Sequence, residues 1–176
     1  VQTTHFIKDK LISGDLSGKA TNDQIVLQGT GTVGQVPVRA HWSSRIGPGR
    51  DGSSLLTGTA ELSALAVDEF DMGFPANTFS GRADGDFRME IARGTPPRFT
   101  LSSDLVGLGI DFAPLGWRKP AESAGALEVD MTITSPAQID RFGFEAPGLA
   151  ANGSVRLRDK GGLDRVTLSG FEVGNW

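Results

Sequence analysis

Apolar and polar residues alternate along most of this chain, which is the period of β-strands rather than of helices. From Leu127 to Ile133, every second residue is apolar, and the residues between them carry carboxylate or hydroxyl groups. The same alternation occurs in residues 24–28, 36–42, 56–62, 86–91, 99–102, 154–158 and 165–169. We therefore predict at least eight strands, each with one apolar face and one largely polar face.

This alternation is typical of an antiparallel sheet that has solvent on one face. A parallel α/β sheet would instead show continuous apolar runs between helical segments, and the sequence contains neither. The predicted fold class is mostly β: a long curved antiparallel sheet, either an open groove or a half-barrel, with one or two short helices. We expect residues 1–176 to form a single β-rich module, cut from a longer polypeptide.

Turn-forming residues separate several of the predicted strands. They are Asn22-Asp23, Gly34-Gln35, Asp84-Gly85, Thr95-Pro96-Pro97 and the run 159–162. Longer loops are expected at residues 47–53 and 116–125. At Asn152-Gly153, the flanking pattern is more consistent with a strand that continues through the pair.

One segment breaks the alternation and predicts a short helix. Leu65 and Met72 are seven residues apart, so both would lie on one stripe of a helix. Pro75 follows shortly afterwards and would end this helix. A second, weaker helical pattern covers residues 136–140.

Composition narrows the possible classes of function. The chain has no cysteine, which excludes disulfides, a thiol nucleophile and a cysteine-based metal site. A formal net charge of −4 does not provide the basic face that nucleic-acid binding needs. The 24 glycines are about twice the usual share and indicate turns, bulges and bends in a sheet. No apolar stretch approaches the roughly 18 residues of a membrane-spanning helix.

The residues that could support catalysis or metal binding are few. His5 and His41 are the two histidines, and both are expected to be solvated, with His41 on the polar face of a strand. Asp68, Glu69 and Asp71 could be calcium ligands, but they lack EF-hand spacing and also suit an exposed helix. Because no catalytic motif is recognisable, we predict that the chain is not an enzyme and needs no cofactor or metal.

The segment from Leu115 to Pro120 contains Trp117, Arg118 and Lys119 in succession. Trp117 at a membrane interface, with the two cations on lipid headgroups, is one interpretation. The other is a surface loop whose tryptophan closes one end of the core, and this second interpretation is favoured.

The order of several motifs resembles the AsmA-like C-terminal region of YhdP-type proteins. The motifs are residues 104–112 leading into 115–120, residues 146–153 followed by a strand and by 163–166, the run 29–38, and Gly73-Phe74-Pro75 before Ser80-Gly81. The resemblance covers most of the chain, although each motif alone is of low specificity.

The AsmA/YhdP-like resemblance implies both a location and a function. Such proteins are anchored in the inner membrane, extend across the periplasm and form a curved β-groove that carries phospholipids toward the outer membrane. The implied partners are phospholipid acyl chains and the rest of the same polypeptide, namely its membrane anchor and neighbouring β-modules. The family has no catalytic residues to carry over. An isolated fragment can also self-associate through open sheet edges, without physiological meaning.

The apolar members of the alternating runs are the candidate lipid-binding wall. They are Ile25, Leu27, Val36, Val38, Leu56, Leu62, Phe87, Met89, Ile91, Phe99, Leu101, Leu127, Val129, Met131, Ile133, Val155, Leu157, Val166 and Leu168. The alternation leaves two structures open, because a groove and the closed core of a β-sandwich give the same pattern. A closed sandwich or β-solenoid with a structural or adhesive role is therefore the alternative.

Overall fold

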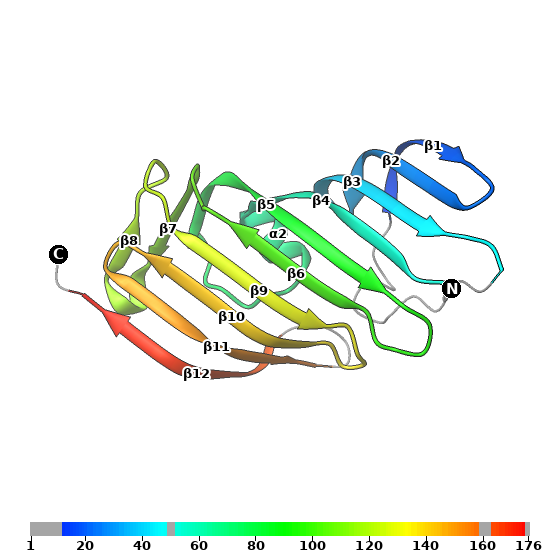
Figure 1. Ribbon diagram of the computed structural model, residues 1–176. Coiled ribbons are helices and arrows are strands. Elements are labelled where there is room, and N and C mark those ends of the chain that lie inside the picture. Colours follow the sequence, from blue (N-terminus) through cyan, green and yellow to red (C-terminus); the bar gives the residue numbers. More distant parts are fainter. Residues whose placement is uncertain (1–11, 49–51, 159–162, 175–176) are drawn as a thin grey trace.

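The computed structural model describes residues 12–48, 52–158 and 163–174, which form one antiparallel sheet of 12 strands (Figure 1). Ten strands follow one another in the order β1-β2-β3-β4-β5-β6-β9-β10-β11-β12, and the sheet does not close, since β1 and β12 do not pair. The strands are β1 (Ile12–Ala20), β2 (Gln24–Val33), β3 (Val36–Arg45), β4 (Ser54–Ser63), β5 (Phe79–Ile91), β6 (Arg98–Ser103), β7 (Leu108–Phe112), β8 (Trp117–Lys119), β9 (Ala126–Thr132), β10 (Gln138–Ala146), β11 (Leu149–Leu157) and β12 (Leu163–Val173).

The predicted fold class is confirmed, because all eight alternating runs form strands of a curved, open antiparallel sheet. The described residues do not form the closed sandwich or solenoid of the alternative. Four further strands, β1, β7, β8 and β10, are present in addition to the strands of the eight alternating runs.

The helix predicted from Leu65 to Met72 is present as α2 (Ala64–Glu69), and it ends three residues earlier than expected. The helix suggested for residues 136–140 is wrong, because β10 begins at Gln138. Ile139 is the physical reason: it lies opposite Met131 on β9 and Val155 on β11, so its side chain belongs to an apolar row of the sheet.

Most predicted turns are confirmed, and two predicted connections are wrong. Asp84 and Gly85 do not form a turn but continue β5, where they lie opposite Glu61 and Ala60. The predicted loop at residues 116–125 contains β8, which pairs with β7. The strand through Asn152-Gly153 is confirmed as part of β11. The run 159–162 and residues 49–51 lie outside the described part of the chain.

The first residues of β5 leave the main sheet and start a second layer. Phe79 to Gly81 pair with β7, whereas Arg82 onward pairs with β4. Gly81 has a φ of 70°, and a Cβ atom there would lie 2.3 Å from the carbonyl oxygen of Gly107. Only glycine allows the two layers to approach so closely at this point.

The hydrophobic core lies where this second layer covers one end of the sheet. Leu108, Ile110 and Trp117 of β7 and β8 pack with side chains of β5, β10 and β11. The cluster of buried residues comprises Ala83, Leu105, Leu108, Ile110, Trp117, Ala146 and Leu149. The connection between β7 and β8 includes the short 3-10 helix Ala113–Leu115. We call this end of the sheet the covered end and the opposite ends of the strands the open end.

Two glycines show that the sheet bends toward its apolar face. A Cβ atom on Gly58 would lie 1.9 Å from the carbonyl oxygen of Arg39, and one on Gly29 would lie 2.0 Å from the carbonyl oxygen of Asp15. In both cases the neighbouring strand occupies the space in front of the glycine. Such an approach is possible only without a side chain, so these glycines permit the concave curvature.

Candidate functional site

The register of the sheet places two uninterrupted rows of apolar residues side by side on one face. The first row runs through Leu16, Gly29, Ala40, Gly58, Phe87, Leu101, Val129, Phe142, Gly153 and Leu168. The second runs through Gly18, Leu27, Trp42, Leu56, Met89, Phe99, Met131, Ile139, Val155 and Val166. Neither row contains a polar side chain, and both extend from the first edge strand to the last.

These rows define the apolar face, which is long enough to hold extended hydrocarbon chains. Neighbouring strands are about 4.8 Å apart, so nine spacings give a row of roughly 43 Å. Phe87 and Phe99 stack within the face, with ring centroids 6.0 Å apart. A sheet face of this kind has no charged group that a bound acyl chain would have to desolvate.

The opposite face is polar over the same strands. A row through Ser17, Gln28, His41, Thr57, Arg88, Thr100, Asp130 and Arg141 crosses from β1 to β10. Arg88 pairs with Glu90 at 2.8 Å and Arg141 with Asp130 at 2.7 Å. Solvated ion pairs of this kind mark a face that contacts water, so the sheet is amphipathic throughout.

The predicted wall residues lie on the apolar face. Eighteen of the 19 belong to its strands, and Ile133 directly follows β9. Val36, Met131 and Ile133 are buried, while Val166 and Leu168 on the edge strand are 45% and 51% exposed. The other fourteen keep part of their surface accessible, even in the middle of the sheet. The face is therefore only partly covered, as a groove requires.

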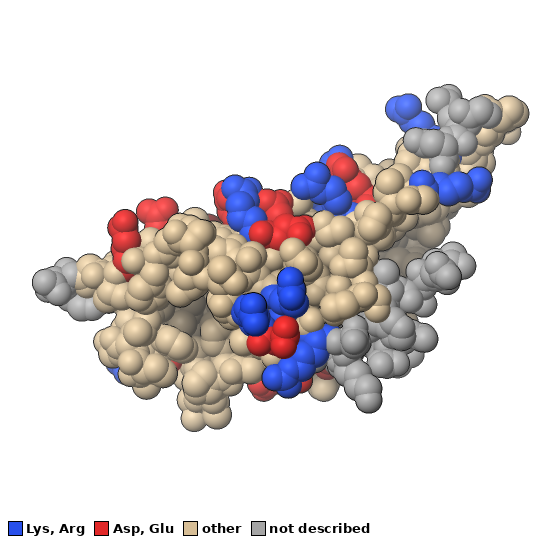
Figure 2. All heavy atoms as spheres, turned by 90° about the horizontal axis from the view of Figure 1, so that it is seen from below, with Lys and Arg blue, Asp and Glu red and all other residues tan. Residues whose placement is uncertain are grey.

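The second layer closes this groove at one end. Phe79 and Phe112 of the second layer, and Leu127 and Phe144 of the main sheet, pack against the buried cluster. Figure 2 shows charged side chains in a row along the upper margin of the molecule and a hollow in its lower left part. The apolar face and the β7–β8 layer together form a trough that is covered at one end.

Trp117 and Lys119 hold the second layer in place, and the proposed membrane-interface role of residues 117–119 is wrong. Trp117 is 1% exposed, and its indole Nε1 donates a hydrogen bond of 3.0 Å to the carbonyl oxygen of Pro147. It closes one end of the core, as the favoured interpretation expected, although it does so from a strand rather than a loop. Arg118 remains exposed and pairs with Asp111.

Lys119 is buried, which the sequence did not indicate. Its Nζ donates hydrogen bonds to the carbonyl oxygens of Leu105, Leu108 and Pro120, at 2.8, 2.9 and 3.2 Å. Burial lowers the pKa of Lys119 from its usual 10.5, and the carboxylates of Asp104 and Glu122 partly oppose this shift.

Several residues of the apolar face were missing from the predicted wall. Trp42 ended a recognised alternating run but was left out. Phe142 and Phe144 alternate with Gly143, yet the bulge in β10 next to Ile139 hides the pattern. On β1, Leu16 lies between Gly14 and Gly18, which occupy apolar-face positions. The strand follows the period of two, but glycines stand where apolar side chains were expected.

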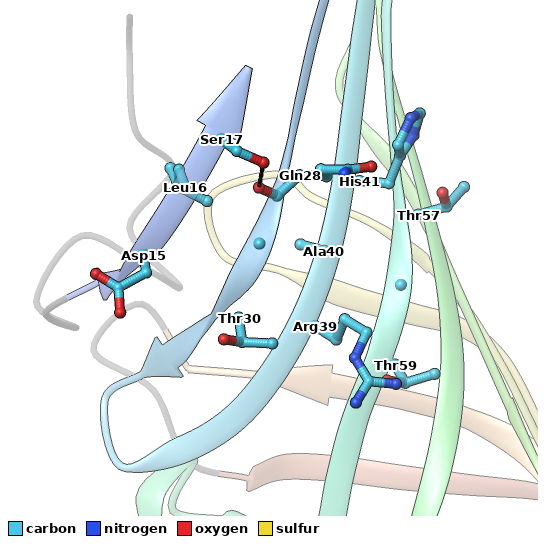
Figure 3. Close-up of a pocket in the computed structure, with 12 residues that line it drawn as sticks. Asp15, Leu16, Ser17, Gln28, Thr30, Arg39, Ala40, His41, Thr57 and Thr59 are labelled. Atoms are coloured by element: carbon cyan, nitrogen blue, oxygen red, sulfur yellow. Dashed lines mark hydrogen bonds between the residues drawn. The ribbon is translucent and has the colours of Figure 1, made fainter.

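An open hollow of about 630 Å³ lies over β1 to β4, and its lining includes Leu16, Gly29, Ala40 and Gly58 of the first apolar row (Figure 3). Asp15, Ser17 and His41 are among its lining residues, and His41 lies on the polar face as expected. No hydrogen bond links these three side chains; the Ser17 hydroxyl instead donates to the carbonyl oxygen of Gln28 at 3.4 Å. The hollow therefore does not contain an assembled acid–base pair. His5 lies outside the described residues.

The acidic cluster near α2 has a structural contact. The Glu69 carboxylate accepts a hydrogen bond of 3.3 Å from the backbone N–H of Gln35 and so ties the helix to the β2–β3 turn. Among the residues that the structure describes, no group of three or more acidic or histidine side chains could hold a metal ion. No helix in this part of the chain is long and apolar enough to cross a membrane.

Comparisons of this chain with known protein families, with characterised proteins and with solved structures found no match. The apolar face, its curvature and its covered end are thus the features on which a function must be based.

Proposed function

We propose that this chain is a non-catalytic β-groove segment of an inner-membrane-anchored periplasmic protein, and that it shields phospholipid acyl chains during transport toward the outer membrane. The main support is the pair of apolar rows, which cross all ten strands of the sheet path without a polar side chain. The periplasmic location and the transport toward the outer membrane are proposed from the order of motifs that resembles AsmA/YhdP-like proteins.

The energetic role of such a groove follows from the cost of exposing lipid tails to water. Each CH₂ group contributes about 0.8 kcal/mol, so a chain of about 16 carbons carries on the order of 10 kcal/mol. A continuous apolar wall lowers this barrier without any bond being made or broken. Met89 suits this task, because its flexible side chain is partly accessible and adapts to chains of different shape.

The exposure of the central residues favours a groove over a closed core. Phe87, Leu101 and Val129 lie opposite one another in the middle of the sheet, where a sandwich would bury them fully. Each instead keeps part of its surface accessible. A contiguous, partly exposed apolar surface in a soluble segment is typical of a binding site.

The two edge strands suit neighbouring β-modules as partners. All neighbours along the ten-strand path are antiparallel, so β1 and β12 run in opposite directions. Leu16 on β1 and Leu168 on β12 are exposed and belong to the same apolar row. A further module of the same kind could therefore pair with either edge and extend the groove with its apolar face on the same side.

Native mass spectrometry with phospholipid vesicles tests this proposal. We expect the purified chain to take up phospholipid, and Leu101→Gln to reduce uptake about tenfold, because it places an amide in the middle of the first row. Thr100→Gln is the matched control: it is the adjacent residue on the polar face, so uptake should remain unchanged. Thermal melts must show both variants folded. A folded wild-type chain that takes up neither phospholipid nor an acyl-chain probe would disprove the proposal.

A further inference from the structure

The last strand of the sheet has one free edge. β12 pairs with β11 on one side, and among the described residues no strand pairs with its other side (Figure 1). The backbone N–H and C=O groups that point to this side can therefore pair with a further strand. β12 has 11 residues and contains neither proline nor lysine, two residue types that protect sheet edges from pairing.

Apolar side chains are exposed along this edge. Val166, Leu168, Phe171 and Val173 are between 45% and 51% exposed, and all four lie on the apolar face. In the interior of the sheet, such residues have a neighbouring strand on both sides. A row of half-exposed apolar side chains along a free edge is a surface that a partner strand would cover.

The order of faces along β12 is the same from either end. Its ladder with β11 defines nine positions, because Asp164 and Ser169 are skipped where the register shifts. The nine positions are occupied by Leu163, Arg165, Val166, Thr167, Leu168, Gly170, Phe171, Glu172 and Val173. Apolar-face and polar-face residues alternate strictly through them, and Leu168 is the midpoint. Two β12 strands can therefore lie antiparallel about Leu168 with matching faces at every position.

The charges of β12 are complementary in this same register. Arg165 and Glu172 are equally far from the midpoint, so Arg165 of each copy would lie opposite Glu172 of the other. On the apolar face, Val166 would lie opposite Phe171. Opposite charges and apolar pairs at directly facing positions stabilise a ladder. Each pair occurs twice, as in the self-complementary interface of a twofold dimer.

Within one copy, Arg165 has an unfavourable neighbour. Arg156 of β11 lies directly opposite it, and like charges at such positions are destabilising. Among the described residues, neither arginine has an ion-pair partner within 4.0 Å. Glu172 of a second copy would place a carboxylate on the other side of Arg165 and offset this repulsion.

The free edge at the other end of the sheet matches β12 less well. β1 also has nine positions, from Ile12 to Ala20. In an antiparallel pair of β12 and β1 with all nine positions in contact, Arg165 would lie opposite Lys19, and Glu172 opposite Ser13. The first of these contacts is repulsive and the second leaves the carboxylate without a cation. The best partner for β12 is therefore a second β12.

We propose that this chain forms a symmetric dimer in which β12 pairs antiparallel with β12 of a second copy, in the register centred on Leu168. The inference goes beyond the proposed function and does not depend on lipid binding. It differs from unselective association of open edges, because one register matches both the faces and the charges. The twofold axis is perpendicular to the sheet, so both apolar faces lie on the same side and the two covered ends lie at opposite ends.

Cysteine cross-linking tests the register, since the chain has no cysteine of its own. Leu168 would face its own copy with about 4.5–5.5 Å between the Cα atoms, a distance that a disulfide bridges. We expect Leu168→Cys to form a covalent dimer under mild oxidation. Val166→Cys is the control on the same edge, because its two copies would be roughly 14 Å apart along the ladder and should not cross-link. Leu16→Cys on β1 should not cross-link either.

Charge exchange tests the pairing of Arg165 with Glu172. Sedimentation velocity over a range of protein concentrations, without lipid, measures the dissociation constant of the dimer. Arg165→Glu and Glu172→Arg should each raise this constant about tenfold or more, because each places like charges opposite one another twice. An equimolar mixture of the two variants should form dimers again, and so should the double variant. Lys19→Glu on β1 should leave the constant unchanged, and thermal melts must show all variants folded.

Three results would each overturn the proposed dimer. The first is a wild-type chain that stays monomeric at every concentration. The second is equal cross-linking of Leu168→Cys, Val166→Cys and Leu16→Cys, which would indicate unselective association of open edges. The third is a dissociation constant that does not respond to the charge changes. Because all these measurements are made without lipid, none of the three results bears on the groove proposal, which lipid uptake tests separately.

Discussion

The ammonium group of Lys119 donates a hydrogen bond of 2.8 Å to the carbonyl oxygen of Leu105, a residue 14 positions earlier in the chain. Through this bond β8, a strand of the layer that covers one end of the trough, is fixed to the connection between β6 and β7. A buried cation held only by carbonyl oxygens is costly to desolvate, and its position can be tested directly.

Lys119→Met should lower the free energy of unfolding by roughly 2–4 kcal/mol, because it keeps the apolar stem but leaves buried carbonyl oxygens without their charged donor. Urea denaturation measures the change. Arg118→Met is the matched control on the neighbouring, exposed position and should cost about 0–1 kcal/mol. An unchanged unfolding midpoint for Lys119→Met would contradict a structural role for this lysine.

The stability of the protein should also rise with pH in the alkaline range. Burial lowers the pKa of Lys119 in the folded state, whereas the unfolded chain keeps a value of 10.5. Between these two values the unfolded state binds a proton that the folded state does not, so the free energy of unfolding increases with pH, by at most about 1.4 kcal/mol per pH unit. Urea titrations across this range should show the rise in the wild type and in Lys19→Met. If the free energy of unfolding of Lys119→Met rises with pH to the same extent, another group causes the effect.

Gly58→Ala should destabilise the sheet by roughly 1–3 kcal/mol, because the new methyl group would lie 1.9 Å from the carbonyl oxygen of Arg39. The curvature of the apolar face must then relax, and lipid uptake should fall with it. Gly143→Ala is the control, since a Cβ atom there meets nothing within 4 Å; its stability should be unchanged or up to about 1 kcal/mol higher. Chemical denaturation of both variants gives the comparison, and equal stability would refute the close approach at Gly58.

Fluorescence can report where acyl chains bind. Trp42 lies in the second apolar row and is partly exposed, whereas Trp117 on β8 is buried in the hydrophobic core. In a Trp176→Phe background, lipids with brominated tails should quench the Trp42 emission of a Trp117→Phe variant. They should leave the Trp117 emission of a Trp42→Phe variant almost unchanged. Equal quenching of both would place the tails elsewhere than on the apolar face.

The alternation of the sequence predicted much of the sheet and of its apolar face. Runs such as that from Leu127 to Ile133 specify which side chains leave water, and the register then brings them onto one surface. The prediction missed residues of the apolar face where local features hide the alternation. In β10 the bulge next to Ile139 interrupts the alternation, and in β1 glycines occupy the apolar positions that let the strand bend.

The sequence by itself determined an amphipathic, antiparallel sheet with short helical interruptions, because a period of two assigns each side chain to one face regardless of what lies opposite. Only the tertiary structure decided that this face is an open trough with one covered end. That outcome depends on contacts between distant segments: Lys119 with Leu105, Trp117 with Pro147, and Gly81 with Gly107. The alternation indicates which side chains avoid water. Whether protein or another apolar molecule contacts them depends on which strands fold over them.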